Sequence, residues 1–359
     1  MIAILQPHIP HYREAFFEGM FETSPIKVYC YNSDESVLKD NFKKSTFKGH
    51  YIKNYSLGPF LVYSLLPFLK KDCNKLVLML HFGHISTWLL LFLKPFHKKK
   101  IILWGQGISV KRYLKEEKMP SILLKVMIYL ADAIWVYTKK EEEMWTDVFP
   151  NKKITALNNT ISNIEEILNL NHFCSIKELK NKYNIKQEKC FIFCARFNSP
   201  YRRIDLLEEV INRLDKSKWG FIIIGSGDYK PDFSIYTNVY DFGTVYDKKL
   251  KDDLFTIADL YIQPGWVGLS IVEALAYGKP VVTFKRSDQT LQCVEYTYLI
   301  HRFNSLIFSN IEECINNLIS MKEEDIKEMS INACKYVREN LTMANMIENS
   351  LNSLNSLGK

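Results

Sequence analysis

Short runs of β-branched and aromatic residues alternate with longer helix-like segments along most of this sequence. The first run is Ile2–Leu5, and the first helix-like segment is His11–Glu22. The alternation restarts after a polar stretch at residues 158–175. Strands that alternate with helices form parallel sheets with helices on both faces. We therefore predict an α/β protein with two Rossmann-like, doubly wound domains.

A chain of 359 residues is longer than a single core normally supports, which also favours two domains. We predict a first domain at residues 1–160, a second at 161–340, and a C-terminal helix within 341–359 that packs back on the first domain. Further strands are predicted at Lys27–Tyr31, Leu76–Leu80, Ile101–Trp104, Ala133–Tyr137, Ile154–Leu157, Cys190–Ala195, Trp219–Ile224, Val239–Phe242, Leu260–Gln263 and Pro280–Phe284. Further helices are predicted at Ser86–Lys94, Ser121–Leu130, Arg203–Leu214, Lys248–Ile257, Ser270–Tyr277, Ile311–Met321, Glu323–Asn340 and Thr342–Leu354.

Positive charge is concentrated in the first half of the sequence. Residues 1–160 carry 23 Lys and Arg against 14 Asp and Glu, whereas the remainder carries 24 against 26. Three stretches of this half place leucines and aromatics beside lysines: Gly58–Lys71, Thr87–Lys100 and Val110–Tyr129. This pattern fits attachment to an anionic membrane surface. The alternative is helix faces that pack on a sheet while their lysines extend to solvent.

The cysteines and the apolar stretches indicate in which cellular compartment the protein lies. The eight cysteines include no CxxC pair, and several lie inside apolar runs, which is typical of buried thiols in a reducing environment. We predict no signal peptide, because the N-terminus lacks a basic region and a small-residue cleavage site. The longest uncharged stretch, Asn54–Leu69, is too short to span a bilayer. We expect a cytoplasmic protein, at most peripheral at the inner face of the cell membrane.

The strongest local motif is QPGWVGLSIVEALAYGKPVVTF, from Gln263 to Phe284. It predicts a strand, a glycine-containing loop, a helix and a second strand. The helix would present free N–H groups near Leu269 and Ser270, which suit an anion, and Glu273 in its first turn could accept bonds from ribose hydroxyls. The alternative is a tight turn in which Glu273 only complements the helix dipole.

Two further motifs follow predicted strands. In CFIFCARFNSPYRR, Arg196 ends a strand and Arg202 opens the next helix. Arginines in this position suit a diphosphate, because the planar guanidinium bonds two oxygens at once. In IIIGSGDY, Gly225 and Gly227 follow another strand, but the third glycine of a nicotinamide-type fingerprint is missing.

In this order, the three motifs resemble those of family 4 (group 1) glycosyltransferases of the GT-B fold, over residues 188–285. The resemblance implies two Rossmann-like domains that face a cleft. It implies that Arg196 and Arg202 hold the donor diphosphate and that Glu273 binds the ribose. The other donor-binding residues that we predict are Gly227, Gly243, Val245, Gly268, Leu269 and Ser270.

The sequence departs from the family pattern at the sugar end of this site. The first Glu of the E-x7-E motif would stand at position 265, where this chain has Gly265, followed by Trp266. Relatives commonly carry a histidine just after the strand that ends at Trp104, and Gln106 occupies that region here. Arg202 replaces the usual lysine and preserves its charge.

Candidate acceptor-side residues come from the first domain. His8, His11 and Arg13 follow the first predicted strand, and His84 follows a later one. A lone histidine is more often structural than functional, so a structural role is the alternative for each. His81 and His84 form H-x-x-H, which is no zinc signature without a third ligand, and we predict no metal site.

The resemblance implies a retaining, metal-independent glycosyltransferase of the hexosyl type that needs no cofactor. The donor would be a UDP- or GDP-sugar, and the acceptor a lipid-linked saccharide of a cell-surface glycan such as lipopolysaccharide or capsule. Arg196 and Arg202 would stabilise the leaving diphosphate, with Gln106 near the transferred sugar, and we expect no nucleic-acid partner. The alternatives are a sugar-nucleotide epimerase of the same fold and a non-catalytic sugar-nucleotide-binding protein.

Overall fold

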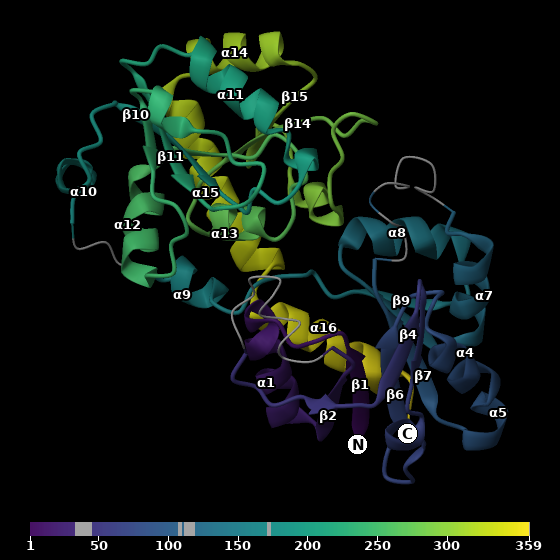
Figure 1. The fold of residues 1–359 in the computed structure, drawn as a ribbon. Helices are drawn as coiled ribbons and strands as arrows, with labels where there is room; N and C mark the ends of the chain where they lie inside the picture. Colours follow the sequence, from purple (N-terminus) through teal and green to yellow (C-terminus); the bar gives the residue numbers. More distant parts are fainter. Residues whose placement is uncertain (33–44, 107–109, 111–118, 171–173, 359) are drawn as a thin grey trace. The chain divides into compact units, whose positions relative to one another are not determined.

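The computed structural model describes residues 1–32, 45–106, 110, 119–170 and 174–358 (Figure 1). The chain divides into two compact units. Unit 1 consists of Met1–Asn163 together with Thr342–Lys359, and unit 2 consists of Ile164–Leu341. Each unit is a parallel sheet covered by helices, so the predicted α/β class is confirmed.

The sheet of unit 1 has seven strands in the order β3-β2-β1-β6-β7-β8-β9. Every neighbouring pair in this sheet is parallel. The strands are β1 (Ile2–Gln6), β2 (Ile26–Cys30), β3 (His50–Tyr51), β6 (Lys75–Met79), β7 (Lys100–Trp104), β8 (Ala133–Val136) and β9 (Lys153–Ala156). All five residues of β1 are buried, because a central parallel strand is covered by helices on both faces.

The helices of unit 1 connect these strands. They are η1 (His11–Arg13), α1 (Glu14–Thr23), α3 (Leu66–Leu69), α4 (Ile85–Phe92), α5 (Lys94–His97), α7 (Ile122–Leu130), α8 (Lys139–Val148) and α16 (Met343–Ser356). A separate antiparallel hairpin, β4 (Asn54–Leu57) with β5 (Phe60–Tyr63), precedes β6. The sequence-based prediction did not include this hairpin, whose turn contains Gly58 in the left-handed region at φ 55°.

The sheet of unit 2 has six strands in the order β12-β11-β10-β13-β14-β15, again all parallel. The strands are β10 (Lys189–Cys194), β11 (Trp219–Ile224), β12 (Val239–Asp241), β13 (Leu260–Ile262), β14 (Val281–Phe284) and β15 (Ser305–Phe308). The first five were predicted and β15 was not. The strand order reverses between β10 and β13, as in Rossmann-type sheets.

The helices of unit 2 cover both faces of this sheet. They are α9 (Ile164–Leu168), α10 (Ile176–Lys182), α11 (Ile204–Arg213), α12 (Lys248–Ile257), α13 (Ser270–Ala276), α14 (Ile311–Ser320) and α15 (Glu323–Asn340), with short turns η3 (Pro200–Arg202), η4 (Phe233–Ile235) and η5 (Val294–Tyr298). Phe191, Phe193 and Phe221 of the sheet are fully buried and form the centre of the core together with Leu207 and Val210 of α11. Within the described ranges of the chain, no helix is long and apolar enough to cross a membrane.

The C-terminal helix α16 packs on unit 1, where Figure 1 shows it in yellow beside the purple α1. The Trp135 indole N–H donates to the Ser353 hydroxyl at 2.9 Å, and the Lys75 ammonium donates to the Leu354 carbonyl at 2.9 Å. Met346 is fully buried. Unit 1 is therefore completed by a segment that follows the whole of unit 2 in the sequence.

We expect Met346→Ala to lower the free energy of unfolding of unit 1 by about 2–5 kcal/mol, because it leaves a cavity between α16 and the sheet. Chemical denaturation followed by tryptophan fluorescence measures this loss. The exposed neighbour Asn352, changed to alanine, serves as the control and should stay within about 0.5 kcal/mol of the parent protein. An equal effect of both substitutions would mean that α16 contributes no buried contacts in solution.

Candidate functional site

Loops after β10 and β13 meet at the point where the strand order of unit 2 reverses. In open parallel sheets, ligands bind beyond the carboxyl ends of the strands at this point. Arg196 lies just after β10, and Gly265–Ser270 lie after β13. The Gly265 N–H donates to the Arg202 carbonyl at 3.2 Å, so the two loops are in direct contact. The predicted diphosphate-binding residues therefore lie at the expected edge of the sheet.

Arg202 ends the turn η3, and its guanidinium lies partly beneath the surface. Its Nε is buried and has no hydrogen-bond acceptor within the described residues. Burial lowers the pKa of Arg202, and the nearby positive charge of Arg196 acts in the same direction. A buried guanidinium N–H without an acceptor is uncommon, because leaving it unsatisfied is costly. Arg196 itself is exposed. The two arginines thus form a positively charged site that an anion would satisfy.

Two buried glutamines hold the loop after β13. The Gln263 amide donates to the Trp266 carbonyl at 2.7 Å, and its oxygen accepts from the hydroxyls of Tyr261 at 2.7 Å and Ser270 at 2.8 Å. From the far side of the loop, Gln292 accepts from the Val267 N–H at 2.9 Å. The sequence analysis assigned no role to either glutamine. Gln263 gave a local signal, since it is a polar residue at the end of an apolar strand, whereas Gln292 lies in an irregular segment before η5.

Gly265 occupies a place where a side chain does not fit. A Cβ at this position would lie 2.4 Å from the Tyr201 carbonyl oxygen and 3.0 Å from Cγ of Arg203. Trp266 adopts φ 54°, which is strained for a bulky residue, and its ring stacks on Tyr201 at 5.0 Å between centroids. The close packing of these two loops therefore leaves no room for the glutamate that the E-x7-E motif would place at position 265.

The start of α13 contains the predicted residues Gly268, Leu269 and Ser270. The carbonyls of Gly268 and Leu269 accept from the N–H groups of Ile271 and Val272, both at 3.1 Å. The backbone N–H groups of Gly268, Leu269 and Ser270 have no acceptor in the part of the chain that the structure describes. They lie on the loop that contacts Arg202, and their binding of an anion remains a prediction.

Glu273 forms a partly buried ion pair that the sequence analysis did not anticipate. The Lys251 ammonium of α12 donates to Glu273 Oε1 at 2.6 Å, and the side chains are 27% and 12% exposed. Burial alone would lower the pKa of Lys251, but the Glu273 carboxylate outweighs this effect and raises it. The ion pair orients Glu273 while engaging one of its two oxygens. Its predicted contact with ribose remains a prediction.

The predicted donor residues Gly227, Gly243 and Val245 lie on the loops after β11 and β12. The Gly225 N–H donates to the Gly243 carbonyl at 2.7 Å, which joins these loops. A Cβ on Gly227 would lie 2.5 Å from the Phe197 carbonyl carbon, so this glycine permits contact with the Arg196 loop. Gly243 has φ 61° with open space around its Cα, and Val245 is half-buried. All three loops share the edge of the sheet that carries the arginines.

Two of the predicted acceptor-side residues, Arg13 and His84, are buried. Arg13 is 6% exposed, donates to Asn159 Oδ1 at 3.0 Å, and lies over the rings of Trp104 and Tyr137 at 4.7 and 5.2 Å. His84 is 5% exposed. Both side chains are thus almost fully buried, and their contact with an acceptor remains a prediction.

The His84 ring lies within an aromatic cluster, where the rings of Tyr31 and His81 are 5.4 and 4.9 Å away between centroids. Burial, with a smaller contribution from His81, lowers the pKa of His84 to about 4. The ring is therefore neutral at physiological pH.

The other candidates of unit 1 lie at the carboxyl ends of its strands. His8 follows β1 and is half-buried, whereas His11 begins η1 and is exposed. Gln106 lies just after β7 and is half-buried. The strand order of unit 1 reverses between β1 and β6, so His8 and His11 flank its switch point. Their roles toward an acceptor, and that of Gln106 toward the sugar, remain predictions.

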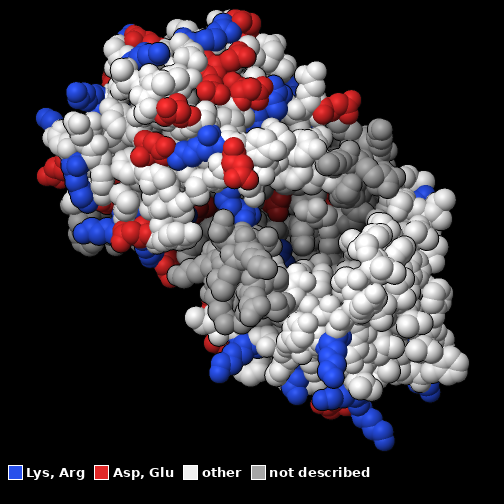
Figure 2. Space-filling model, viewed as in Figure 1, with Lys and Arg blue, Asp and Glu red and all other residues white. Residues whose placement is uncertain are grey.

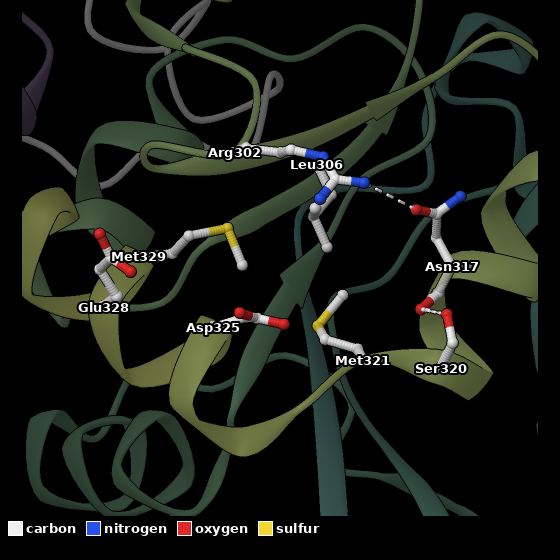
Figure 3. Close-up of a pocket in the computed structure, with 8 residues that line it drawn as sticks. All are labelled: Arg302, Leu306, Asn317, Ser320, Met321, Asp325, Glu328 and Met329. Atoms are coloured by element: carbon white, nitrogen blue, oxygen red, sulfur yellow. Dashed lines mark hydrogen bonds between the residues drawn. The ribbon is translucent and has the colours of Figure 1, made fainter.

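A separate pocket lies at the opposite edge of the unit 2 sheet. Figure 3 shows its lining, with Arg302 directed toward Asn317 of α14 and with Asp325 of α15 below them. The pocket contains none of the predicted donor residues. Because it adjoins the C-terminal end of α14 and the N-terminal end of α15, it lies away from the carboxyl ends of the strands. It is therefore not the predicted donor site.

Comparison with known proteins agrees with this geometry. Residues 188–317 match the family model described as glycosyl transferases group 1, and this match confirms the resemblance seen in the sequence. No curated protein matches the chain by sequence.

Solved structures match over almost the whole chain. The Anabaena protein Alr3699/HepE in complex with UDP is 14% identical, with 99% of each chain covered and a TM-score of 0.68. The lipopolysaccharide outer core galactosyltransferase WaaB in its apo form is 13% identical, with 99% of each chain covered and a TM-score of 0.66. A mutant of S. aureus TarM with fondaparinux, alpha-GlcNAc-glycerol and UDP is 12% identical, with 99% of each chain covered and a TM-score of 0.63. At these identities the likeness shows the fold, which is GT-B.

We expect Gly265→Ala to destabilise unit 2 by about 1–3 kcal/mol, because the new methyl group would collide with the Tyr201 carbonyl. Urea denaturation measures the loss. Gly268→Ala is the matched control on the same loop, since its Cβ would meet only Cys293 Sγ at 3.8 Å. If the two alanine variants are equally stable, the loops do not approach as closely in solution as described.

We expect the stability of unit 1 to fall as the pH is lowered from 6.5 toward 4. Folding keeps His84 neutral down to about pH 4, whereas an unfolded histidine takes up a proton near its ordinary pKa of 6.5. The unfolded state therefore binds more protons in this range, and the loss should reach roughly 2–3 kcal/mol. The measurement is the free energy of unfolding at several pH values between 6.5 and 4. The decrease toward low pH should disappear in His84→Gln and persist in His50→Gln, a control at an exposed histidine.

Proposed function

We propose, from the group 1 glycosyltransferase segment at residues 188–317 and the GT-B fold, that this protein transfers a sugar from a UDP- or GDP-sugar to a glycan acceptor. The observation that carries the proposal is the buried Nε of Arg202, at the switch point of unit 2, which lacks an acceptor in the described structure. With Arg196 beside it, this site would hold the donor diphosphate through charge-assisted hydrogen bonds. The UDP bound in the HepE and TarM structures supports a nucleotide donor.

The acceptor that we propose is a lipid-linked saccharide of a cell-surface glycan, such as lipopolysaccharide or capsule. WaaB, which shares the fold, is named as a lipopolysaccharide outer core galactosyltransferase, and this supports a hexosyl transfer of the same kind. His8 and His11, which follow β1 at the switch point of unit 1, would contact this acceptor. The site of action would be the cytoplasm, at the inner face of the membrane.

The reaction that we propose retains the configuration at the anomeric carbon and needs no metal or cofactor. The bond from the anomeric carbon to the diphosphate oxygen breaks, and a bond to the acceptor oxygen forms on the same face. The acceptor proton passes to the departing diphosphate oxygen. Arg196 and Arg202 would stabilise the charge on that group, and Gln106 would bind the sugar. Gly265 leaves no carboxylate at that position, which also suits a protein that binds sugar nucleotides without turnover.

The first test screens UDP- and GDP-sugars for thermal stabilisation of the protein. The best binder is then assayed for release of nucleoside diphosphate, with and without lipid-phosphate saccharide acceptors. Release that requires an acceptor supports the proposal. Interconversion of the sugar would identify an epimerase, and binding without turnover would identify a non-catalytic protein. Failure of all sugar nucleotides to bind would contradict the proposed donor site.

We expect Arg196→Ala and Arg202→Ala each to reduce turnover by roughly 10²–10³-fold, because each removes a charged donor from the leaving diphosphate. Steady-state release of nucleoside diphosphate measures the effect. Arg213→Ala is the matched control, since this arginine pairs with Glu312 on the surface of unit 2, and it should keep near-normal turnover. Near-normal turnover in both site variants would show that the diphosphate binds elsewhere.

A further inference from the structure

Unit 1 carries a broad apolar surface that its own core does not use. Of the 25 large hydrophobic side chains exposed in the described residues, 17 lie between residues 51 and 129. Phe96 and Ile122 are the most exposed of them, at 83% and 78%. Proteins that remain free in solution scatter such residues singly, so a concentration of this size indicates a binding surface.

Helix α7 shows that the surface is separate from the core. Its residues Leu124, Met127 and Ile128 are buried against the unit. The side chains on its other face are also apolar and are exposed: Ile122, Leu123, Val126 and Tyr129. A helix that is apolar all round is normally buried on all sides. Among the described residues of unit 1, the outer face of α7 therefore has no covering partner.

The neighbouring elements extend this surface. Helix α4 contacts both α7 and β5, and it exposes Leu89 and Phe92. Across the hairpin, Tyr55 pairs with Val62 and Leu57 with Phe60, and all four side chains are exposed. Figure 2 shows a nearly uninterrupted uncharged surface over the part of unit 1 where Figure 1 labels α4, α5 and α7.

Lysines gather at one edge of this surface. A pocket beside α5 is lined by Leu69, Lys71, His97, Lys98, Lys99 and Lys100. Lys99 is buried, and its ammonium donates to the Lys70 carbonyl at 2.7 Å. Lys71 and Lys98 are exposed. Of the nearby acids, Asp132 pairs with Lys94 at 3.0 Å and Asp72 is exposed. The edge thus has a net positive charge and adjoins Phe96.

We propose that this apolar–basic face, formed by the outer sides of β4–β5, α4, α5 and α7 with the lysine pocket beside α5, binds the surface of an anionic phospholipid bilayer. Apolar side chains flanked by lysines are the pattern that enters the headgroup region of such membranes. A protein partner would explain the apolar area but not the lysines at its edge. The proposed function locates the protein at the membrane, and this proposal rests on it in naming the face that binds there. The face belongs to unit 1 alone, so it does not depend on the donor site.

The test is co-sedimentation of the full chain with phosphatidylcholine vesicles that contain or lack phosphatidylglycerol. We expect binding only with phosphatidylglycerol, and a decline as salt rises through roughly 0.5 M. Two double variants test the apolar and the basic parts of the face separately. Phe96→Ser with Ile122→Ser removes apolar contacts, and Lys71→Glu with Lys98→Glu reverses two positive charges. Each should weaken binding by roughly tenfold or more. The control, Ile319→Ser with Ile331→Ser, changes exposed residues of unit 2 and should bind as the parent does.

Equal binding to both kinds of vesicle, or full binding by both face variants, would overturn the proposal. A parent protein that forms dimers in analytical ultracentrifugation, and that the Phe96 and Ile122 changes make monomeric, would also overturn it in favour of a second copy of this chain. Thermal stabilisation by sugar nucleotides is measured in parallel. It should be unchanged in the face variants, so failure of membrane binding and failure of the donor site can be told apart.

Discussion

The hydrogen bonds from two buried glutamines to the loop after β13 determine the geometry of the donor end of unit 2. Gln263 and Gln292 fix the path of residues 264–268, and this path brings Gly265 against the Tyr201 carbonyl and the Arg202 backbone. Because buried polar networks must be fully satisfied, a small change in either glutamine would shift the loop as a whole. The positions of the arginines, of Trp266 and of the start of α13 all depend on this one arrangement.

Much of the fold could be predicted from the sequence, because parallel strands buried on both faces appear as continuous apolar runs. The strands from Ile2 to Phe284 that form most of both sheets were recognised in this way. The hairpin β4–β5 was missed, since its alternating pattern lies inside a stretch rich in leucine. Strand β15 was missed because it follows the turn η5 and the left-handed residue Arg302 and not a helix, so the strand–helix alternation is interrupted there.

The site could be predicted only where a motif is local. Arg196, Arg202 and Glu273 follow strands at fixed spacings, so their edge of the sheet was predictable. Lys251 was not, because it meets Glu273 only through the packing of α12 against the sheet. The burial of Arg13 and His84 was not predictable either, since nothing in their sequence neighbourhoods distinguishes a buried cation or imidazole from an exposed one.

The return of α16 to unit 1 has a consequence for biosynthesis. Unit 2 is continuous in sequence, whereas unit 1 needs residues from both ends of the chain. During translation all of unit 2 is therefore synthesised before the last helix of the β1–β9 sheet. The surfaces of Met20 and Trp135 that α16 covers stay open until this helix has been made, and such exposed apolar surface favours aggregation of the nascent chain.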